Sequence, residues 1–305
     1  MQTWKKAGRA AIACVIAVGI AQSISPAGEK AIIRVGTKDF TESLIVGELY
    51  SLALEDAGYG VERVFNIAGS VVHTSIVNNQ IDLYPEYTGT GLLTVLKMEL
   101  MTDPVLVYET VKREYERRFN LVWLDQSRAN DSQGLVMRTS VAREHGIVTI
   151  SDLQQKADRI RFASQGEFDL RDDGLPGLTK VYGPFRWKSS RVYDNGLKYH
   201  VLLNDQADLA PAYTTEGRLA NTRDFTLLQD DKQMWPPYFL APVVRGGVLG
   251  EYPDLAPVLN RVSASLDTGI MIRLNAEVDL EQREVEDVAK EYFSTIGPQT
   301  WNAGQ

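Results

Sequence analysis

The fold is decided by the stretch Asn78-Asn-Gln-Ile-Asp-Leu-Tyr-Pro-Glu-Tyr87-Thr-Gly-Thr-Gly91, which occurs a second time further along the chain. The second copy is Asn204-Asp-Gln-Ala-Asp-Leu-Ala-Pro-Ala-Tyr213-Thr-Thr-Glu-Gly217, and 8 of the 14 aligned positions are identical. Their separation of 126 residues is far longer than the roughly 20–50 residues of a solenoid repeat. The repeat therefore indicates duplication of a whole lobe.

Strand-like and helix-like segments alternate around both copies. Ala31–Gly36 is a short β-branched run, and Ser43–Ala57 has apolar residues at helical spacing. The same order continues with a strand at Val61–Phe65, a helix at Val71–Asn79, a strand at Ile81–Tyr84 and a helix at Thr88–Leu96. This alternation predicts an α/β fold with mainly parallel sheets. Two such lobes imply a ligand cleft between them.

Lobe boundaries follow from the two halves of the repeat. Gly134–Met137 and Pro237–Val244 have the composition of extended crossover strands. We therefore assign residues 28–133 and 237–305 to lobe I and residues 134–236 to lobe II. The acidic, amphipathic segment Glu277–Phe293 is expected to form one helix on the outside of lobe I.

Residues 1–27 have the pattern of a secretory signal peptide. A basic start precedes an apolar run from Ala10 to Ala21, which is too short to span a bilayer. Small residues predict cleavage after Ala27, with a competing site after Ser23. We therefore expect an exported, periplasmic protein.

The net charge and the cysteine content limit the binding partners and the covalent cross-links that we expect for this protein. Removal of residues 1–27 takes away three basic residues and no acid, which moves the formal net charge from −8 to −11. Such an acidic protein is a poor match for nucleic acid. The single cysteine, Cys14, lies in the predicted signal peptide, so the remaining chain forms no disulfide.

Motifs for catalysis, nucleotides or metals are absent from the sequence. There is no phosphate-binding loop and no nucleophile elbow, and the three histidines are too scattered to suggest a zinc site. We therefore expect no enzyme activity, no cofactor and no metal. Asp82 and Asp208 occupy equivalent positions of the repeat, which favours a structural role such as capping the following turn.

The two repeated tyrosines are the first candidate ligand contacts. Tyr87 and Tyr213 each follow a strand and a proline, where loops of open α/β sheets bind ligands. Tyrosine faces attract cations, and a quaternary ammonium, which has no hydrogen-bond donor, needs such faces. The alternative is that both are core tyrosines.

Lys38, Thr90 and Arg171 are candidates for binding an anion. Lys38 and Arg171 follow the predicted first strands of their lobes, and arginine can bind a carboxylate through two parallel hydrogen bonds. Thr90 stands at a predicted helix N-terminus, where backbone N–H groups favour negative charge. Together with the tyrosines, these residues suggest a zwitterionic ligand.

Four motifs of the chain resemble the glycine betaine, choline and carnitine binding proteins of osmoprotectant ABC importers. These are Gly36-Thr-Lys38-Asp-Phe40-Thr-Glu, Asp82-Leu-Tyr-Pro-Glu-Tyr87-Thr-Gly-Thr90, Ala212-Tyr213-Thr-Thr-Glu-Gly217 and Pro236-Pro-Tyr238. The resemblance implies a bilobal type II periplasmic binding fold with two crossover strands. It also implies a monomer that passes its ligand to a membrane permease driven by a cytoplasmic ATPase.

By this resemblance, Tyr87 and Tyr213 are walls of an aromatic cage, and Lys38, Thr90 and Arg171 hold the carboxylate of a betaine. Two further cage positions align with Ser132 and Arg191, which are not aromatic; Tyr193, Trp187 or Trp235 are candidates to replace them. Two interpretations follow: a weak betaine binder, or a protein for another carboxylated solute. A sensor that signals to a membrane receptor is the alternative function, and an enzyme on the same fold is the least favoured.

Overall fold

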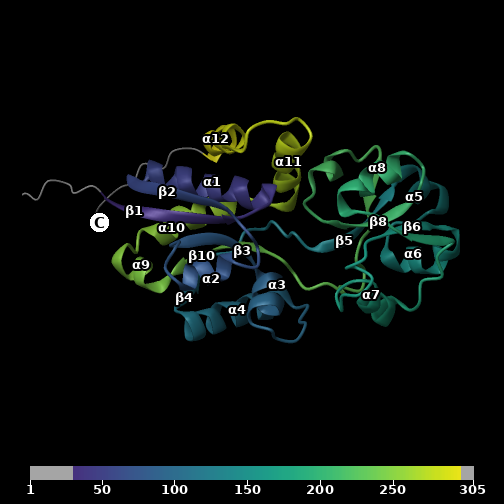
Figure 1. The fold of residues 1–305 in the computed structure, drawn as a ribbon, viewed down its shortest axis with the longest axis horizontal. Helices are drawn as coiled ribbons and strands as arrows, with labels where there is room; N and C mark the ends of the chain where they lie inside the picture. Colours follow the sequence, from purple (N-terminus) through teal and green to yellow (C-terminus); the bar gives the residue numbers. More distant parts are fainter. Residues whose placement is uncertain (1–29, 297–305) are drawn as a thin grey trace, which may run out of the picture.

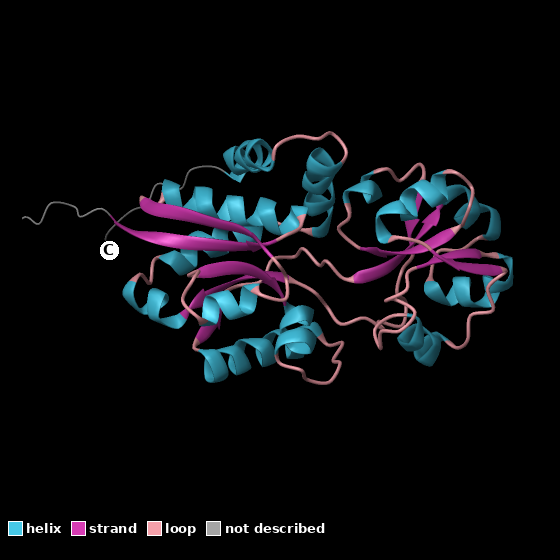
Figure 2. Cartoon of the chain, in the orientation of Figure 1, coloured by secondary structure: helices cyan, strands magenta, loops and turns pink. Residues whose placement is uncertain are grey.

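The computed structural model describes residues 30–296 and contains two separate five-stranded sheets. The predicted signal peptide and Cys14 lie outside the described residues. The sheets belong to two lobes that lie side by side and are joined by extended chain segments (Figures 1 and 2). The predicted bilobal α/β fold is therefore confirmed.

Lobe I contains the first sheet, in the order β2-β1-β3-β10-β4. Its strands are β1 (Lys30–Lys38), β2 (Tyr59–Ile67), β3 (Leu83–Tyr87), β4 (Leu121–Trp123) and β10 (Leu240–Arg245). Its helices are α1 (Thr41–Asp56), α2 (Val72–Val77), α3 (Thr88–Thr90), the π-helix η1 (Gly91–Val95), α4 (Pro104–Phe119), α9 (Gly246–Glu251), α10 (Leu255–Ser265), α11 (Thr268–Asp279) and α12 (Val285–Ile296).

Lobe II contains the second sheet, in the order β7-β6-β8-β5-β9. Its strands are β5 (Gln133–Arg138), β6 (Arg161–Ser164), β7 (Ser189–Val192), β8 (Leu209–Tyr213) and β9 (Phe225–Leu227). Its helices are α5 (Thr139–His145), α6 (Ile150–Lys156), η2 (Ala157–Arg159), α7 (Leu175–Tyr182), η3 (Asn195–Leu197), α8 (Lys198–Leu203) and η4 (Gly217–Ala220).

The sheets are mixed, which corrects the expectation of mainly parallel sheets. In lobe I, β1 pairs in parallel with β2 and β3, but β10 pairs antiparallel with both β3 and β4. In lobe II, β5 takes the place of β10. Both antiparallel strands follow a segment that arrives from the other lobe, so each enters its sheet against the direction of the βα units. The segments expected as crossover strands, Gly134–Met137 and Pro237–Val244, thus coincide with β5 and with most of β10.

The repeated aspartates join strands within each sheet. Asp82 accepts hydrogen bonds from the Arg34 guanidinium at 2.8 and 2.9 Å and from Arg245 at 2.8 Å. Its counterpart Asp208 binds Arg161 and Arg138 in the same way. The structural role is as expected, but it consists of clamping strands together rather than capping a turn.

Apolar side chains cover both faces of each sheet. In lobe I, one cluster packs the sheet against α1, α10, α11 and α12, and another packs the opposite face against α2 and α4. Lobe II is likewise divided into two clusters. The expected single helix at Glu277–Phe293 is in fact two helices, because Gln282, with φ of 56°, turns the chain between α11 and α12.

The two linkers between the lobes pair with each other. Residues 124–132 lead from β4 to β5, and residues 228–239 lead from β9 to β10. The backbone N–H of Asp131 donates to the carbonyl of Tyr238 at 3.1 Å, and that of Leu240 donates to Ala129 at 3.1 Å. These bonds hold the linkers together as a two-stranded hinge. The expected boundaries at residues 133/134 and 236/237 fall within or beside it and stay a prediction.

Helix α11 makes a third connection between the lobes. It lies against η4 of lobe II, and Ile272 packs on the apolar cluster that includes Leu219. The Asn275 side chain donates a hydrogen bond of 2.9 Å to the backbone carbonyl of Thr215. Gly217 permits this approach, because a Cβ there would lie 2.6 Å from the backbone nitrogen of Ala276. Among the helices of residues 30–296, none has the length and apolar character needed to cross a membrane.

Candidate ligand-binding cleft

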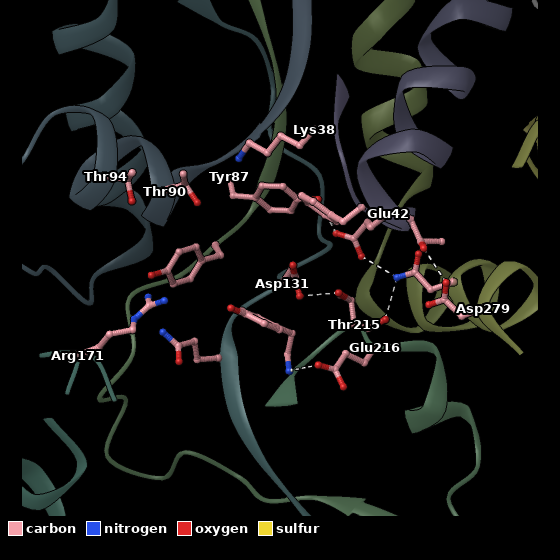
Figure 3. Close-up of a pocket in the computed structure, with 16 residues that line it drawn as sticks. Lys38, Glu42, Tyr87, Thr90, Thr94, Asp131, Arg171, Thr215, Glu216 and Asp279 are labelled. Carbon is pink, nitrogen blue, oxygen red and sulfur yellow. Dashed lines mark hydrogen bonds between the residues drawn. The ribbon is translucent and has the colours of Figure 1, made fainter. Parts of the chain in front are cut away.

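A cavity of about 540 Å³ lies between the lobes, above the paired linkers. Lobe I, lobe II and the hinge all contribute to it, as the close-up in Figure 3 shows. The lining residues are Lys38, Phe40, Thr41, Glu42, Tyr87, Thr90, Thr94, Asp131, Gln133, Arg171, Tyr213, Thr215, Glu216, Tyr238, Asn275 and Asp279. A ligand bound here contacts both lobes and the hinge at once.

Four aromatic residues line the cavity. Tyr87 and Phe40 come from lobe I, with ring centroids 6.0 Å apart, Tyr213 comes from the end of β8, and Tyr238 comes from the hinge. Tyr87 is buried, whereas Tyr213 keeps 42% of its surface exposed toward the cleft. The glycine at position 89 makes room for one of these rings, since a Cβ there would lie 2.6 Å from Cε1 of Tyr238.

Carboxyl groups gather on one side of the cavity. Glu42 accepts hydrogen bonds from the Tyr87 hydroxyl at 2.9 Å and from the Asn275 amide at 3.0 Å. Asp131 accepts one from the Thr215 hydroxyl at 2.6 Å. Burial raises the pKa of Glu42 and of Asp131 above their usual values, and the charge of Glu42 raises that of Asp131 further. A ligand cation placed beside them would favour the ionised carboxylates and so offset the cost of their burial.

Basic and hydroxyl groups face the cavity from the other side. Figure 3 shows Arg171, Thr90 and Thr94 on the left, opposite Glu42, Thr215 and Asp279 on the right. The Arg171 guanidinium is oriented by Asp173, to which Nε and Nη2 donate at 2.8 and 2.6 Å. Within residues 30–296, no group accepts a hydrogen bond from its Nη1. This nitrogen can therefore bind a carboxylate of a ligand.

Lys38 lines the cavity but already has an anionic partner. Its Nζ forms a buried ion pair with Glu86 and lies 5.1 Å from the centre of the Tyr87 ring. Glu86 also accepts the backbone N–H of Tyr87 at 2.8 Å. Because Glu86 balances its charge, Lys38 fixes the position of Tyr87 and offers a ligand its remaining N–H donors rather than a net charge.

All five residues predicted to bind ligand line the cavity: Lys38, Tyr87, Thr90, Arg171 and Tyr213. The four predicted as possible cleft-lining residues do not. Ser132 is buried in the hinge, and Arg191 is exposed on the edge strand β7. Trp235 is buried in the lobe II core, where its indole N–H donates to the carbonyl of Asp173 at 2.7 Å. Tyr193 lines a second cavity in lobe II.

Phe40 and Tyr238 also line the cavity, although they are not among the predicted site residues. Both residues lie in motifs that carry the family resemblance. A motif does not show, however, which of its side chains face the cleft. Tyr238, for example, reaches the cleft only because the two linkers pair. Glu42 and Asp131 were also missed, since a single carboxylate in a sequence does not reveal whether it is buried.

Two α/β lobes, a paired hinge in the cleft and a lining of aromatic and charged groups define a bilobal solute-binding protein. Comparison with known proteins agrees with this class. Residues 31–295 match the family described as the substrate binding domain of ABC-type glycine betaine transport system. The chain belongs to this family, whose members are transport components rather than enzymes.

Individual relatives resemble most of the chain. A glycine-betaine-binding protein of Pseudomonas aeruginosa is 35% identical over 295 residues, covering 93% of this chain and 91% of the relative. The ergothioneine transport permease/ergothioneine binding protein EgtU of Helicobacter pylori is 30% identical over 86% of this chain, which spans only 47% of that relative. A crystal structure of a glycine betaine/carnitine/choline ABC transporter protein has a TM-score of 0.81 at 27% identity, covering 86% of this chain and 98% of that one.

Proposed function

We propose that this protein captures a small zwitterion with a quaternary ammonium group and a carboxylate, and that it delivers this ligand to an inner-membrane permease from the periplasm. Glycine betaine is the simplest such compound. Glycine betaine and ergothioneine, named for two of the relatives, combine these two groups, and so does carnitine, which is named for a solved structure. Choline, named for the same structure, has the quaternary ammonium without the carboxylate. The proposal includes the monomeric state and export through the predicted signal peptide.

One observation carries the proposal: the two ends of the cleft have opposite chemistry. The carboxylates of Glu42 and Asp131 attract a positive charge. The faces of the aromatic rings can contact a quaternary ammonium, which has no N–H group with which to donate a hydrogen bond. Arg171, Thr90 and Thr94 supply donors for a carboxylate. A ligand lying between these ends would bridge the lobes over the hinge and favour the closed form.

The test compares Arg171→Ala with Arg191→Ala, an exposed arginine of the same lobe that does not line the cleft. Calorimetry measures the binding of glycine betaine and choline, which share a quaternary ammonium but differ in the carboxylate. We expect Arg171→Ala to weaken glycine betaine about 10- to 100-fold, the effect of one hydrogen bond to a charged group. Binding of choline changes much less, and Arg191→Ala changes neither.

An equal loss of affinity for glycine betaine and choline in Arg171→Ala would show that Arg171 does not bind the carboxylate. Absence of binding by any betaine to the wild-type protein would end the proposal.

A further inference from the structure

A second cavity, of about 400 Å³, lies within lobe II beside the main cleft. Gln133, Arg171 and Tyr213 line both cavities, so they form the boundary between them. Apart from Lys198 of α8, the rest of the second cavity comes from the carboxyl ends of three parallel strands and the residues after them: Gln165 to Phe168 after β6, Tyr193 and Asp194 after β7, and the end of β8. This is the edge at which open α/β sheets bind ligands.

The walls of this second cavity are suited to a hydrogen-bonding group. Glu167 and Asp194 contribute carboxylates, and Gln165 contributes an amide. Phe168, Pro211 and Ala212 supply apolar surface on which a flat group can lie. Lys198, which also lines it, is held in an ion pair with Glu216 and adds no net positive charge. The cavity therefore favours an uncharged or weakly basic group that donates hydrogen bonds.

We propose that the ligand carries a polar arm that enters this second cavity. The inference rests on the proposed function, which places the carboxylate at Arg171. Since Arg171 lines both cavities, a substituent on the carbon next to the carboxylate lies at the opening between them. Glycine betaine has no such substituent and leaves the second cavity without a ligand group. The ligand class is thus an amino-acid betaine whose side chain donates hydrogen bonds.

Gly166 offers a way to fill the second cavity without touching the main cleft. It lines only the second cavity, and a Cβ at this position would meet no atom nearer than the Val192 side chain at 3.9 Å. Gly166→Leu is therefore expected to fold and to occupy the space of the arm. Gly250→Leu is the matched control, because a Cβ at position 250, in α9, meets nothing within 4 Å.

The experiment measures calorimetric affinities for glycine betaine, alanine betaine and histidine betaine. These share the ammonium and the carboxylate and differ only in having no arm, an apolar arm or a ring that donates an N–H hydrogen bond. We expect histidine betaine to bind the wild-type protein about tenfold more tightly than alanine betaine, as one hydrogen bond to a charged group provides. Gly166→Leu removes this preference and leaves glycine betaine binding unchanged, and Gly250→Leu changes neither.

A second variant, Glu167→Gln, keeps the cavity open and removes one carboxylate charge from an exposed side chain. It should weaken histidine betaine severalfold and spare the other two ligands. The inference is overturned if the three ligands bind equally to the wild-type protein, or if Gly166→Leu retains the preference. If none of the three betaines binds, the proposed function itself is rejected, and with it the inference that a ligand arm enters the second cavity.

Discussion

Tyr87 donates its phenolic hydrogen bond to Glu42 across 2.9 Å, and both side chains are buried at the wall of the cleft. The Tyr87 ring, whose face a cation would contact, is thus hydrogen-bonded to the Glu42 carboxyl group, whose charge is poorly solvated. Glu42 in turn binds Asn275, which bonds to the lobe II backbone. One chain of hydrogen bonds therefore joins a wall of the cleft to the contact between the lobes.

This relationship predicts proton release when a cation binds. Burial raises the pKa of Glu42 above its ordinary value of 4.5, so the empty cleft retains a proton over a pH range above 4.5. A bound cation favours the ionised carboxylate, so affinity should increase as pH increases through that range. Calorimetry in two buffers of different ionisation enthalpy measures the proton directly. Glu42→Gln should reduce the release and flatten the pH dependence; unchanged release would assign the proton to another group.

Tyr238 is expected to be a cage wall. Tyr238→Ala should weaken a quaternary ammonium ligand roughly 2- to 30-fold, corresponding to the loss of one cation–π contact of about 0.5–2 kcal/mol. Tyr238→Phe keeps the ring and should retain most of the affinity. A loss as large for Tyr238→Phe as for Tyr238→Ala would mean that the hydroxyl, and not the ring, contacts the ligand.

The position of that ring depends on Gly89. A methyl group at residue 89 would lie 2.6 Å from Cε1 of Tyr238, so Gly89→Ala should displace the ring and weaken the ligand although every cage residue is present. Gly250→Ala, in open space, is the control. A crystal structure of Gly89→Ala with an undisplaced Tyr238 ring would contradict this explanation.

The contact between α11 and η4 should resist any side chain at Gly217. The Cβ of Gly217→Ala would lie 2.6 Å from a backbone atom, which cannot rotate away as a side chain can. We expect a loss of about 1–3 kcal/mol in the free energy of unfolding and a larger radius of gyration in X-ray scattering as α11 moves from lobe II. Gly247→Ala, with nothing within 4 Å of its Cβ, should show neither effect.

The aspartate clamp of lobe II should fail in acid. Although burial of Asp208 acts to raise its pKa, hydrogen bonds and charge from Arg161 and Arg138 lower it to about 2. Because the folded-state pKa lies below the ordinary value of 3.8, the stabilisation is complete above pH 3.8 and is lost as pH falls through about 2. Asp208→Asn should therefore destabilise lobe II by about 2–3 kcal/mol at pH 7 and hardly at all at pH 2.

Denaturant unfolding at the two pH values measures this difference. Glu291→Gln, which removes the exposed partner of Arg283, provides the control and should have little effect at either pH. A pH-independent loss in Asp208→Asn would argue against a contribution from charge.

Much of the site was predictable from local patterns. Tyr87 and Tyr213 stand at strand ends within a repeated motif, and strand ends of α/β lobes face the cleft. Trp235 was misplaced because a large aromatic near the hinge can point either to the cleft or to the core. The bond from its indole N–H to Asp173 decides for the core. Lys38 was predicted correctly as a lining residue, but its pairing with Glu86 depends on adjacent strands.

The sequence by itself determined the duplication, the alternating strands and helices and five of the residues that line the cleft, because these depend on periodicity and on residues that are neighbours in the chain. Only the tertiary structure decided which aromatic residues complete the cleft, which carboxyl groups lose water and where a second cavity adjoins Arg171. The first two features arise where the lobes, the paired linkers and α11 meet, and the third arises within lobe II where the ends of separate strands converge. Such packing brings together residues as distant in sequence as Glu42 and Asn275. Burial and partner choice at such meeting points are properties of the packed molecule, which no local pattern records.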